Sequence, residues 1–259
     1  MDMTRALTVV AALALIGAAP ARAPAPKGYL SAAEAPDPLR ILPPAPVAGS
    51  SRYEADRTIF LQTRIYKDTP RWALAQNDIN QAAILKDLAC SVGVELTPQN
   101  APKTVDLFKK MLPDVRRAID VPKDFYQRKR PYLIDEGPIC DQKSESLAKS
   151  PDYPSGHNTW SWSVGLVMAE LAPDRATDIL VRARAFGESR LVCGVHNLSA
   201  VEAGRTNASA VVAALHGSDA FRKDLEAARK EVAAARKAGP APDPAACAQE
   251  AALIAKSPY

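Results

Sequence analysis

Apolar residues recur at intervals of three and four along most of the chain, which is the spacing of one face of an α-helix. Two early segments carry the pattern, with apolar positions at Trp72, Leu74, Ile79, Ala83, Ile84 and Leu88 in the first and at Val105, Phe108, Met111 and Leu112 in the second. Further along, it predicts helices over residues 158–171, 175–188, 199–215 and 219–237. The first of these is mostly apolar and the last is rich in Ala, Lys, Arg and Glu, so we expect one buried and one solvated helix. No strand-like alternation survives for more than four or five residues, so the sequence predicts an all-α, single-domain helical bundle.

Proline-rich segments flank the helical region. The prolines of residues 24–50 exclude helix interiors and sheet centres, so this segment is either an extended arm that wraps the domain or a disordered leader. Residues 239–244, GPAPDP, close the other end in the same way. The predicted organisation is an arm over residues 24–50, a helical domain over 51–238 and a C-terminal tail over 239–259.

The first 23 residues have the three-part pattern of a secretory signal peptide. Arg5 precedes an apolar run over residues 6–19, and small residues follow it. The run is shorter than the roughly 20 residues of a membrane-spanning helix, so an uncleaved anchor is the less favoured alternative. Cleavage after Ala23 and cleavage after Ala21 both remain open. We expect a periplasmic or secreted protein.

Composition and motif content argue against several classes of function. The chain has 33 Lys and Arg against 29 Asp and Glu, and a net charge of +4 is too small to predict a nucleic-acid partner. No GxGxxG or GxxxxGK[ST] pattern occurs, and no set of metal ligands stands out, so we predict neither a metal nor another cofactor.

Three short motifs carry the candidate chemistry. Lys123 is followed after six residues by Arg130-Pro131, residues 154–157 read Pro-Ser-Gly-His, and Ser189-Arg190 is followed after five residues by His196. A phosphate dianion needs fixed positive charge on its oxygens, and Lys123, Arg130 and Arg190 supply three cations. Ser155 and Gly156 add a hydroxyl and backbone donors at a predicted helix start, where anions bind readily.

With these motifs in this order and spacing, the chain resembles the type-2 phosphatidic acid phosphatase superfamily, and within it the exported class A bacterial non-specific acid phosphatases. The proline-rich leader supports that branch. The resemblance implies a helical bundle of the kind shared with vanadium haloperoxidases, and metal-independent hydrolysis of phosphate monoesters with an acidic pH optimum. It also implies phosphate or vanadate as a ligand and a homodimer, with no membrane contact once the signal peptide is removed.

The resemblance also assigns roles to two histidines. His196 attacks phosphorus to form a phosphohistidine, while His157 protonates the leaving alcohol and then activates water. The third histidine, His216, precedes Gly217 at a predicted helix end, and we expect it to be structural. Two alternatives are a vanadate-dependent haloperoxidase and a protein that binds phosphate with reduced activity.

One position departs from the family pattern, which continues H-x3-D after the nucleophile. Position 200 is alanine, so the aspartate that orients the histidine ring is missing. We expect a backbone carbonyl, water or the nearby Ser199 to replace it. The alternative is that a carboxylate from elsewhere in the chain replaces it, such as Asp135, Glu136 or Glu202. On this view Ala200→Asp would raise turnover by less than about tenfold.

The four cysteines, Cys90, Cys140, Cys193 and Cys247, are too widely spaced for CxxC motifs and fit two disulfides in an oxidising compartment. Three pairings are possible. The motif arrangement brings Cys140 and Cys193 near one site, so we favour that pair, which leaves Cys90 with Cys247. Free buried thiols are the alternative.

Overall fold

The computed structural model describes residues 27–259, and this part of the chain is helical without a β-strand. Its helices are α1 (Pro38–Ile41), α2 (Ser51–Gln62), α3 (Pro70–Asn77), α4 (Ile84–Asp87), α5 (Ala89–Val92), α6 (Pro102–Tyr126), α7 (Glu145–Lys149), α8 (Gly156–Leu171), α9 (Ala176–Val192), α10 (Leu198–Leu215), α11 (Asp219–Ala238) and α12 (Pro244–Ile254). Short 3-10 turns cover Thr63–Tyr66, Gln81–Ala83, Pro131–Leu133 and Pro173–Arg175. The all-α prediction is confirmed. The predicted signal peptide lies outside the described residues.

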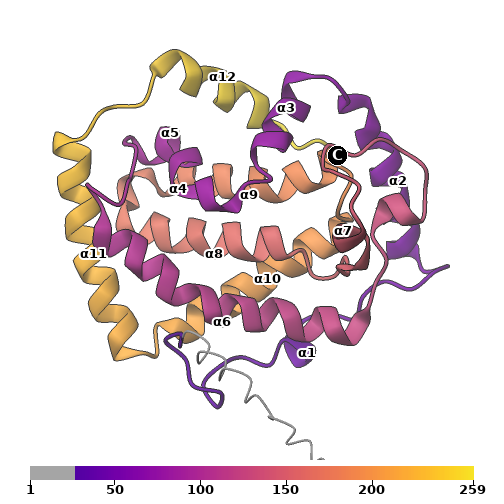
Figure 1. The fold of residues 1–259 in the computed structure, drawn as a ribbon, viewed down its shortest axis with the longest axis horizontal. Coiled ribbons are helices and arrows are strands. Elements are labelled where there is room, and N and C mark those ends of the chain that lie inside the picture. The colour runs from indigo at the N-terminus through magenta and orange to yellow at the C-terminus, as the bar shows by residue number, and fades with distance from the viewer. Residues whose placement is uncertain (1–26) are drawn as a thin grey trace, which may run out of the picture.

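Helix α8 is the centre of the bundle (Figure 1). It lies between α9 and α10, while α6 and α11 pack on its other sides and α3, α5 and α12 cover α9. A Cβ atom added at Gly165 of α8 would lie 2.4 Å from the Cβ of Ala183 in α9, so the glycine allows these helices to approach closely. Among residues 27–259, none of the helices is long and apolar enough to cross a membrane.

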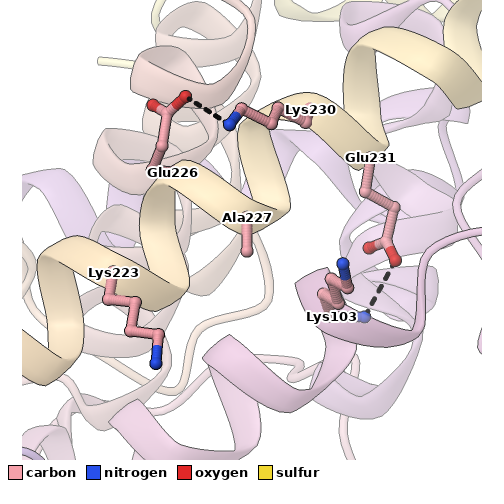
Figure 2. Close-up of a pocket in the computed structure, with 6 residues that line it drawn as sticks. All are labelled: Lys103, Lys223, Glu226, Ala227, Lys230 and Glu231. Atoms are coloured by element: carbon pink, nitrogen blue, oxygen red, sulfur yellow. Dashed lines mark hydrogen bonds and ion pairs between the residues drawn. The ribbon is translucent and has the colours of Figure 1, made fainter.

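Helix α6 runs for 25 residues through Pro113 and Pro122 and buries one apolar face against α8 and α11. No side chain of its own caps its start. Instead Glu231 of α11 accepts hydrogen bonds from the backbone N–H groups of Lys103 (3.0 Å) and Thr104 (2.8 Å), as Figure 2 shows for Lys103. In the surface groove of Figure 2, Lys230 also pairs with Glu226 at 3.7 Å. This groove shares no residue with the cavity described below.

The apolar segment over residues 72–88 is not one helix, contrary to the periodicity. Helix α3 ends at Asn77, a 3-10 turn follows, and α4 begins at Ile84. The Asp78 carboxylate binds the buried Arg182 at 2.7 Å, and the Asn80 side chain accepts from the N–H of Ala82 to start a new turn. Side chains that bond to the nearby backbone compete with helix continuation in this way.

The described part of the proline-rich arm, residues 27–50, lies along the bundle. The N–H of Tyr29 donates to Asp114 of α6 at 2.7 Å, and Leu42 is buried beside Tyr153. The hydroxyl of Tyr153 donates to the carbonyl of Pro43 at 2.6 Å. Residues 27–50 therefore form an arm along the domain and not a disordered leader.

The C-terminal tail contains a helix, α12, that the sequence analysis did not predict. Asp243 accepts from the N–H of Ala245 at its start, and Cys247 forms a disulfide with Cys90. A second disulfide joins Cys140 and Cys193. The predicted pairing is therefore confirmed, and α12 is fixed over α9 and α3.

Candidate active site

A cavity of about 750 Å³ opens at the N-terminal end of α8. It is lined by five of the predicted site residues, Lys123, Arg130, Gly156, His157 and His196. These come from the end of α6, the loop after it, the first turn of α8 and the connection between α9 and α10. Residues more than 70 positions apart are thus brought to one surface. Ser155 and Arg190 are buried and do not line this cavity directly.

Two of the cations are held by neutral groups. Arg130 donates from Nε to the carbonyl of Ser150 (2.7 Å) and from NH1 to the carbonyl of Val195 (2.8 Å). Lys123 donates from Nζ to the carbonyl of Pro151, and burial followed by the charge of Arg130 lowers its pKa to about 8. Carbonyls orient these side chains without cancelling their charge, so the cavity keeps a positive potential for an anion.

Arg190 is the third cation, and its side chain is only 1% exposed. Its NH2 lies 3.4 Å from the carboxylate of Asp141, which lines the cavity. Within residues 27–259, its Nε and NH1 have no hydrogen-bond partner. Buried donors without acceptors destabilise a fold, and phosphate oxygens are acceptors that a guanidinium binds in pairs.

The start of α8 supplies the neutral donors. The Ser155 hydroxyl accepts from the N–H of Asn158 at 3.3 Å, and its backbone N–H donates to the carbonyl of Ala200 at 2.9 Å. The hydroxyl proton remains for another acceptor, so the assignment of Ser155 to phosphate binding stays a prediction. Gly156 lines the cavity, and a Cβ atom there would lie 3.3 Å from the Ile119 side chain.

His157 has a fixed tautomer. Its Nε2 lies 3.1 Å from the carbonyl of Ile79, and a carbonyl only accepts, so Nε2 carries the proton and Nδ1 remains for a substrate. Burial, and after it the charge of Arg190, holds the pKa of His157 well below its usual range. A bound anion would raise that pKa again.

His196 is held at both ring nitrogens. Nδ1 lies 2.8 Å from Oδ1 of Asp152, and Nε2 lies 3.3 Å from NH1 of Arg130. A carboxylate accepts the Nδ1 proton, so Nε2 carries the lone pair. Burial, followed by Arg130 and Lys123, holds the pKa of His196 well below its usual value, which keeps the ring neutral.

The partner of Nδ1 corrects the sequence analysis. It is a carboxylate, so the expectation of a carbonyl, water or Ser199 is wrong, and the Ser199 hydroxyl donates to Asp56 instead. It is also none of the three carboxylates considered, because Asp135 binds Arg57, Glu202 binds Arg52, and Glu136 does not line the cavity. Asp152 lies 44 residues before His196, and helical periodicity does not reveal such a contact. The available signal was an acidic residue just before the Pro-Ser-Gly-His motif, in a chain whose third motif lacks its aspartate.

The turn that presents His196 depends on a glycine. Gly194 has φ +77°, and an added Cβ would lie 2.3 Å from NH1 of Arg64. The N–H of Cys140 donates to the carbonyl of Cys193 at 3.0 Å, beside their disulfide. Together these contacts fix the turn before His196 to the loop that carries Asp141.

His216 lies outside the cavity. Its Nε2 is 3.1 Å from Glu170, and its ring packs edge-on against Phe221, contacts that fit the structural role expected for it. Among the described residues, no group of three or more His, Cys, Asp or Glu side chains is arranged to hold a metal ion.

Comparison with known proteins identifies a family match and several relatives of this chain. Residues 115–223, which contain all three motifs, match the family described as the PAP2 superfamily. The chain is 44% identical over 214 residues to an acid phosphatase of Zymomonas mobilis, a match that covers 82% of this chain and 81% of the relative. It is 34% identical over 204 residues to a non-specific acid phosphatase of Providencia stuartii, covering 77% and 82%. A non-specific acid phosphatase of Salmonella typhimurium is 32% identical over 188 residues, covering 71% of this chain and 75% of that protein.

Proposed function

We propose that this chain, which belongs to the PAP2 superfamily and is an acid phosphatase, hydrolyses phosphate monoesters through a phosphohistidine on His196. One observation carries the proposal. In a cavity lined by cations, the Nδ1 proton of His196 is bound by Asp152, so that Nε2 has its lone pair beside Arg130. A neutral imidazole held in this tautomer is a nucleophile directed at the place where a phosphoryl group would bind.

The phosphoryl oxygens are bound by Lys123, Arg130, Arg190 and the helix start at Gly156. The two unpartnered nitrogens of Arg190 support its part, because they lie in a buried side chain within the described residues. Phosphoryl transfer needs charge neutralisation on these oxygens and an in-line nucleophile. Three fixed cations provide the neutralisation, and we therefore propose that no metal ion is required.

The reaction proceeds in two displacements. In the first, Nε2 of His196 forms a bond to phosphorus, the ester P–O bond breaks, and the leaving oxygen takes a proton from His157. In the second, His157 removes a proton from water, the water oxygen bonds to phosphorus, and the P–N bond breaks to release phosphate. His157 acts through Nδ1, because Nε2–H is bound to the carbonyl of Ile79.

The rest of the cavity, which is available to the alcohol portion of the substrate, has both apolar and polar lining residues. Leu112, Ile119 and Trp160 form an apolar side of the cavity, while Arg116 and Asp120 are polar lining residues. A site that binds mainly the phosphoryl group and surrounds the alcohol with such a lining accepts many alcohols. We propose a broad range of phosphate monoesters as substrates.

Export to the periplasm is part of the proposal. The leader over residues 1–23 has the composition of a signal peptide, and the two disulfides fit an oxidising compartment. A homodimer stays a prediction that rests on the resemblance alone.

Turnover of p-nitrophenyl phosphate by the purified protein, with and without EDTA, tests the proposed function. We expect hydrolysis that EDTA leaves unchanged, and loss of activity in His196→Ala. Oxidation of halide by peroxide only after vanadate is added, without phosphatase activity, would favour the haloperoxidase alternative. Saturable phosphate binding without turnover would favour a binding protein and contradict the proposal.

A further inference from the structure

Asp152 lies in the short loop before α8 and its side chain is completely buried. Its Oδ1 accepts from Nδ1 of His196 (2.8 Å) and from the N–H of Asn197 (3.2 Å). Its Oδ2 accepts from Nδ2 of Asn197 at 2.8 Å, and NH1 of Arg128 lies 3.4 Å away. Both oxygens are therefore engaged, and the carboxylate has one orientation relative to the imidazole ring.

The charge of Asp152 belongs to a buried group of three. Arg128, whose side chain is 6% exposed, binds Asp56 at 2.8 Å as well as lying beside Asp152. One guanidinium therefore faces two carboxylates, and the group carries one negative charge in excess when both are ionised. The imidazole of His196 gains positive charge as Nε2 bonds to phosphorus, and a negative charge held at Nδ1 stabilises that state more than the neutral ring.

Position 200, where the family pattern has its aspartate, faces a different environment. Ala200 is completely buried and packs with Leu42, Tyr153 and Ala203. Its carbonyl accepts from the N–H of Ser155, so the first turn of α10 is joined directly to the loop that carries Asp152. The loop and the helix turn lie side by side at His196, and a carboxylate on the loop serves the same ring.

From this geometry, and resting on the function proposed above, we propose that Asp152 is the positioning residue for His196 and has replaced the aspartate missing at position 200. Asp152 acts through His196 and does not contact substrate. It holds the Nδ1 proton, fixes the ring so that Nε2 is directed into the cavity, and stabilises the cationic ring of the intermediate. Burial raises the pKa of Asp152, and the neighbouring Arg128 opposes that shift and favours the ionised carboxylate.

Asp152→Asn tests this inference, with Asp56→Asn as a matched control. Both substitutions remove a buried carboxylate from the same group around Arg128, but Asp56 does not contact His196. We expect Asp152→Asn to lower kcat and the rate of phosphoenzyme formation by about 10²-fold or more, with KM changed by less than about threefold. Asp56→Asn is expected to lower the melting temperature about as much as Asp152→Asn does, while changing the rate of phosphoenzyme formation by less than about fivefold.

The Nδ1 proton gives a second readout that does not depend on turnover. In the wild-type protein, we expect a downfield NMR resonance from a proton shared between His196 and Asp152, which is lost in His196→Ala and shifted upfield in Asp152→Asn. Equal phosphorylation rates in Asp152→Asn and the wild-type protein, or equal losses in both Asn variants, would overturn the inference. Absence of phosphohistidine in the wild-type protein would instead overturn the proposed function, so the two failures are distinguishable.

Discussion

Nε2 of His196 lies 3.3 Å from NH1 of Arg130, so a guanidinium predicted to bind phosphate also donates to the lone pair of the proposed nucleophile. A bound phosphate offers oxygens that compete for this N–H as stronger, charged acceptors. In the proposed mechanism, we therefore expect substrate binding to release this lone pair when phosphorus comes within reach of Nε2. The same contact keeps His196 in place beforehand, because Arg130 is itself held by the carbonyls of Ser150 and Val195.

Arg190 is expected to contribute through its forked donors as well as its charge. Arg190→Ala should lower kcat/KM by about 10²-fold or more, because it removes two donors from a buried anion site. Arg190→Lys should lower kcat/KM less, since the positive charge remains. Steady-state kinetics with p-nitrophenyl phosphate measure both. Arg184→Ala on the same helix is the control, because Arg184 donates to Glu188 and to the carbonyl of Ile254, whereas two nitrogens of Arg190 have no partner among residues 27–259. Near-normal turnover in Arg190→Ala would remove Arg190 from the site.

The pH dependence should separate the free enzyme from the substrate complex. Burial and Arg190 hold the pKa of His157 below its usual range, so kcat/KM should fall as pH rises above that low value. A bound phosphate dianion favours the protonated ring and raises its pKa, so the fall in kcat should occur at higher pH. Profiles from about pH 4 to about pH 8 give both limbs. His157→Asn should lose the basic limb, and coincident limbs in the wild-type protein would contradict a proton donor beside bound phosphate.

Ala200→Asp is expected to lower stability and give no gain in turnover. The sequence favoured a gain because His196 then lacked a partner, but Asp152 already accepts the Nδ1 proton. A carboxylate at the completely buried position 200 would lie among apolar side chains and close to a site that already holds two carboxylates. Thermal unfolding and kcat test this. In an Asp152→Ala background, Ala200→Asp should lower the stability less. An increase in kcat from Ala200→Asp alone would show that Asp152 does not already accept the Nδ1 proton of His196.

Most of the fold was predictable because it depends on local patterns. The apolar spacing predicted the long helices α8, α9, α10 and α11, whose buried faces repeat every three or four residues. It failed over residues 72–88, where Asp78 and Asn80 make hydrogen bonds that end one helix and start a turn. Helix α6 shows the opposite effect, since it continues through Pro113 and Pro122, where a local rule would end it.

The candidate site was predictable only where a motif contains the residue. Lys123, Arg130, Gly156, His157 and His196 were singled out by spacing and lie around one cavity. The partners of these residues were not, because Asp152, Arg128 and Asp56 come from three separate loops and helices, and their contacts depend on tertiary packing. A single sequence indicates that a carboxylate is missing at position 200, but it does not show which other carboxylate reaches His196.

The two disulfides should have different consequences. Replacing either pair by serine should cost about 2–5 kcal/mol of stability. Loss of Cys140–Cys193 should also lower kcat/KM, because this bond joins the turn before His196 to the loop of Asp141. Loss of Cys90–Cys247 releases α12, which does not line the cavity, so kcat/KM should stay within about twofold. Thermal unfolding and steady-state kinetics on the two double variants check this, and equal losses of activity would contradict the assigned role of the first bond.

Identification of the phosphorylated residue tests the central claim most directly. A rapid quench of the protein with labelled phosphate monoester, kept alkaline to preserve a phosphohistidine, can be followed by peptide mapping. We expect one phosphoryl group on His196, with more label in His157→Ala because hydrolysis of the intermediate is slowed, and none in His196→Ala. Label on another residue such as Ser155, or continued turnover by a correctly folded His196→Ala protein, would contradict the phosphohistidine mechanism.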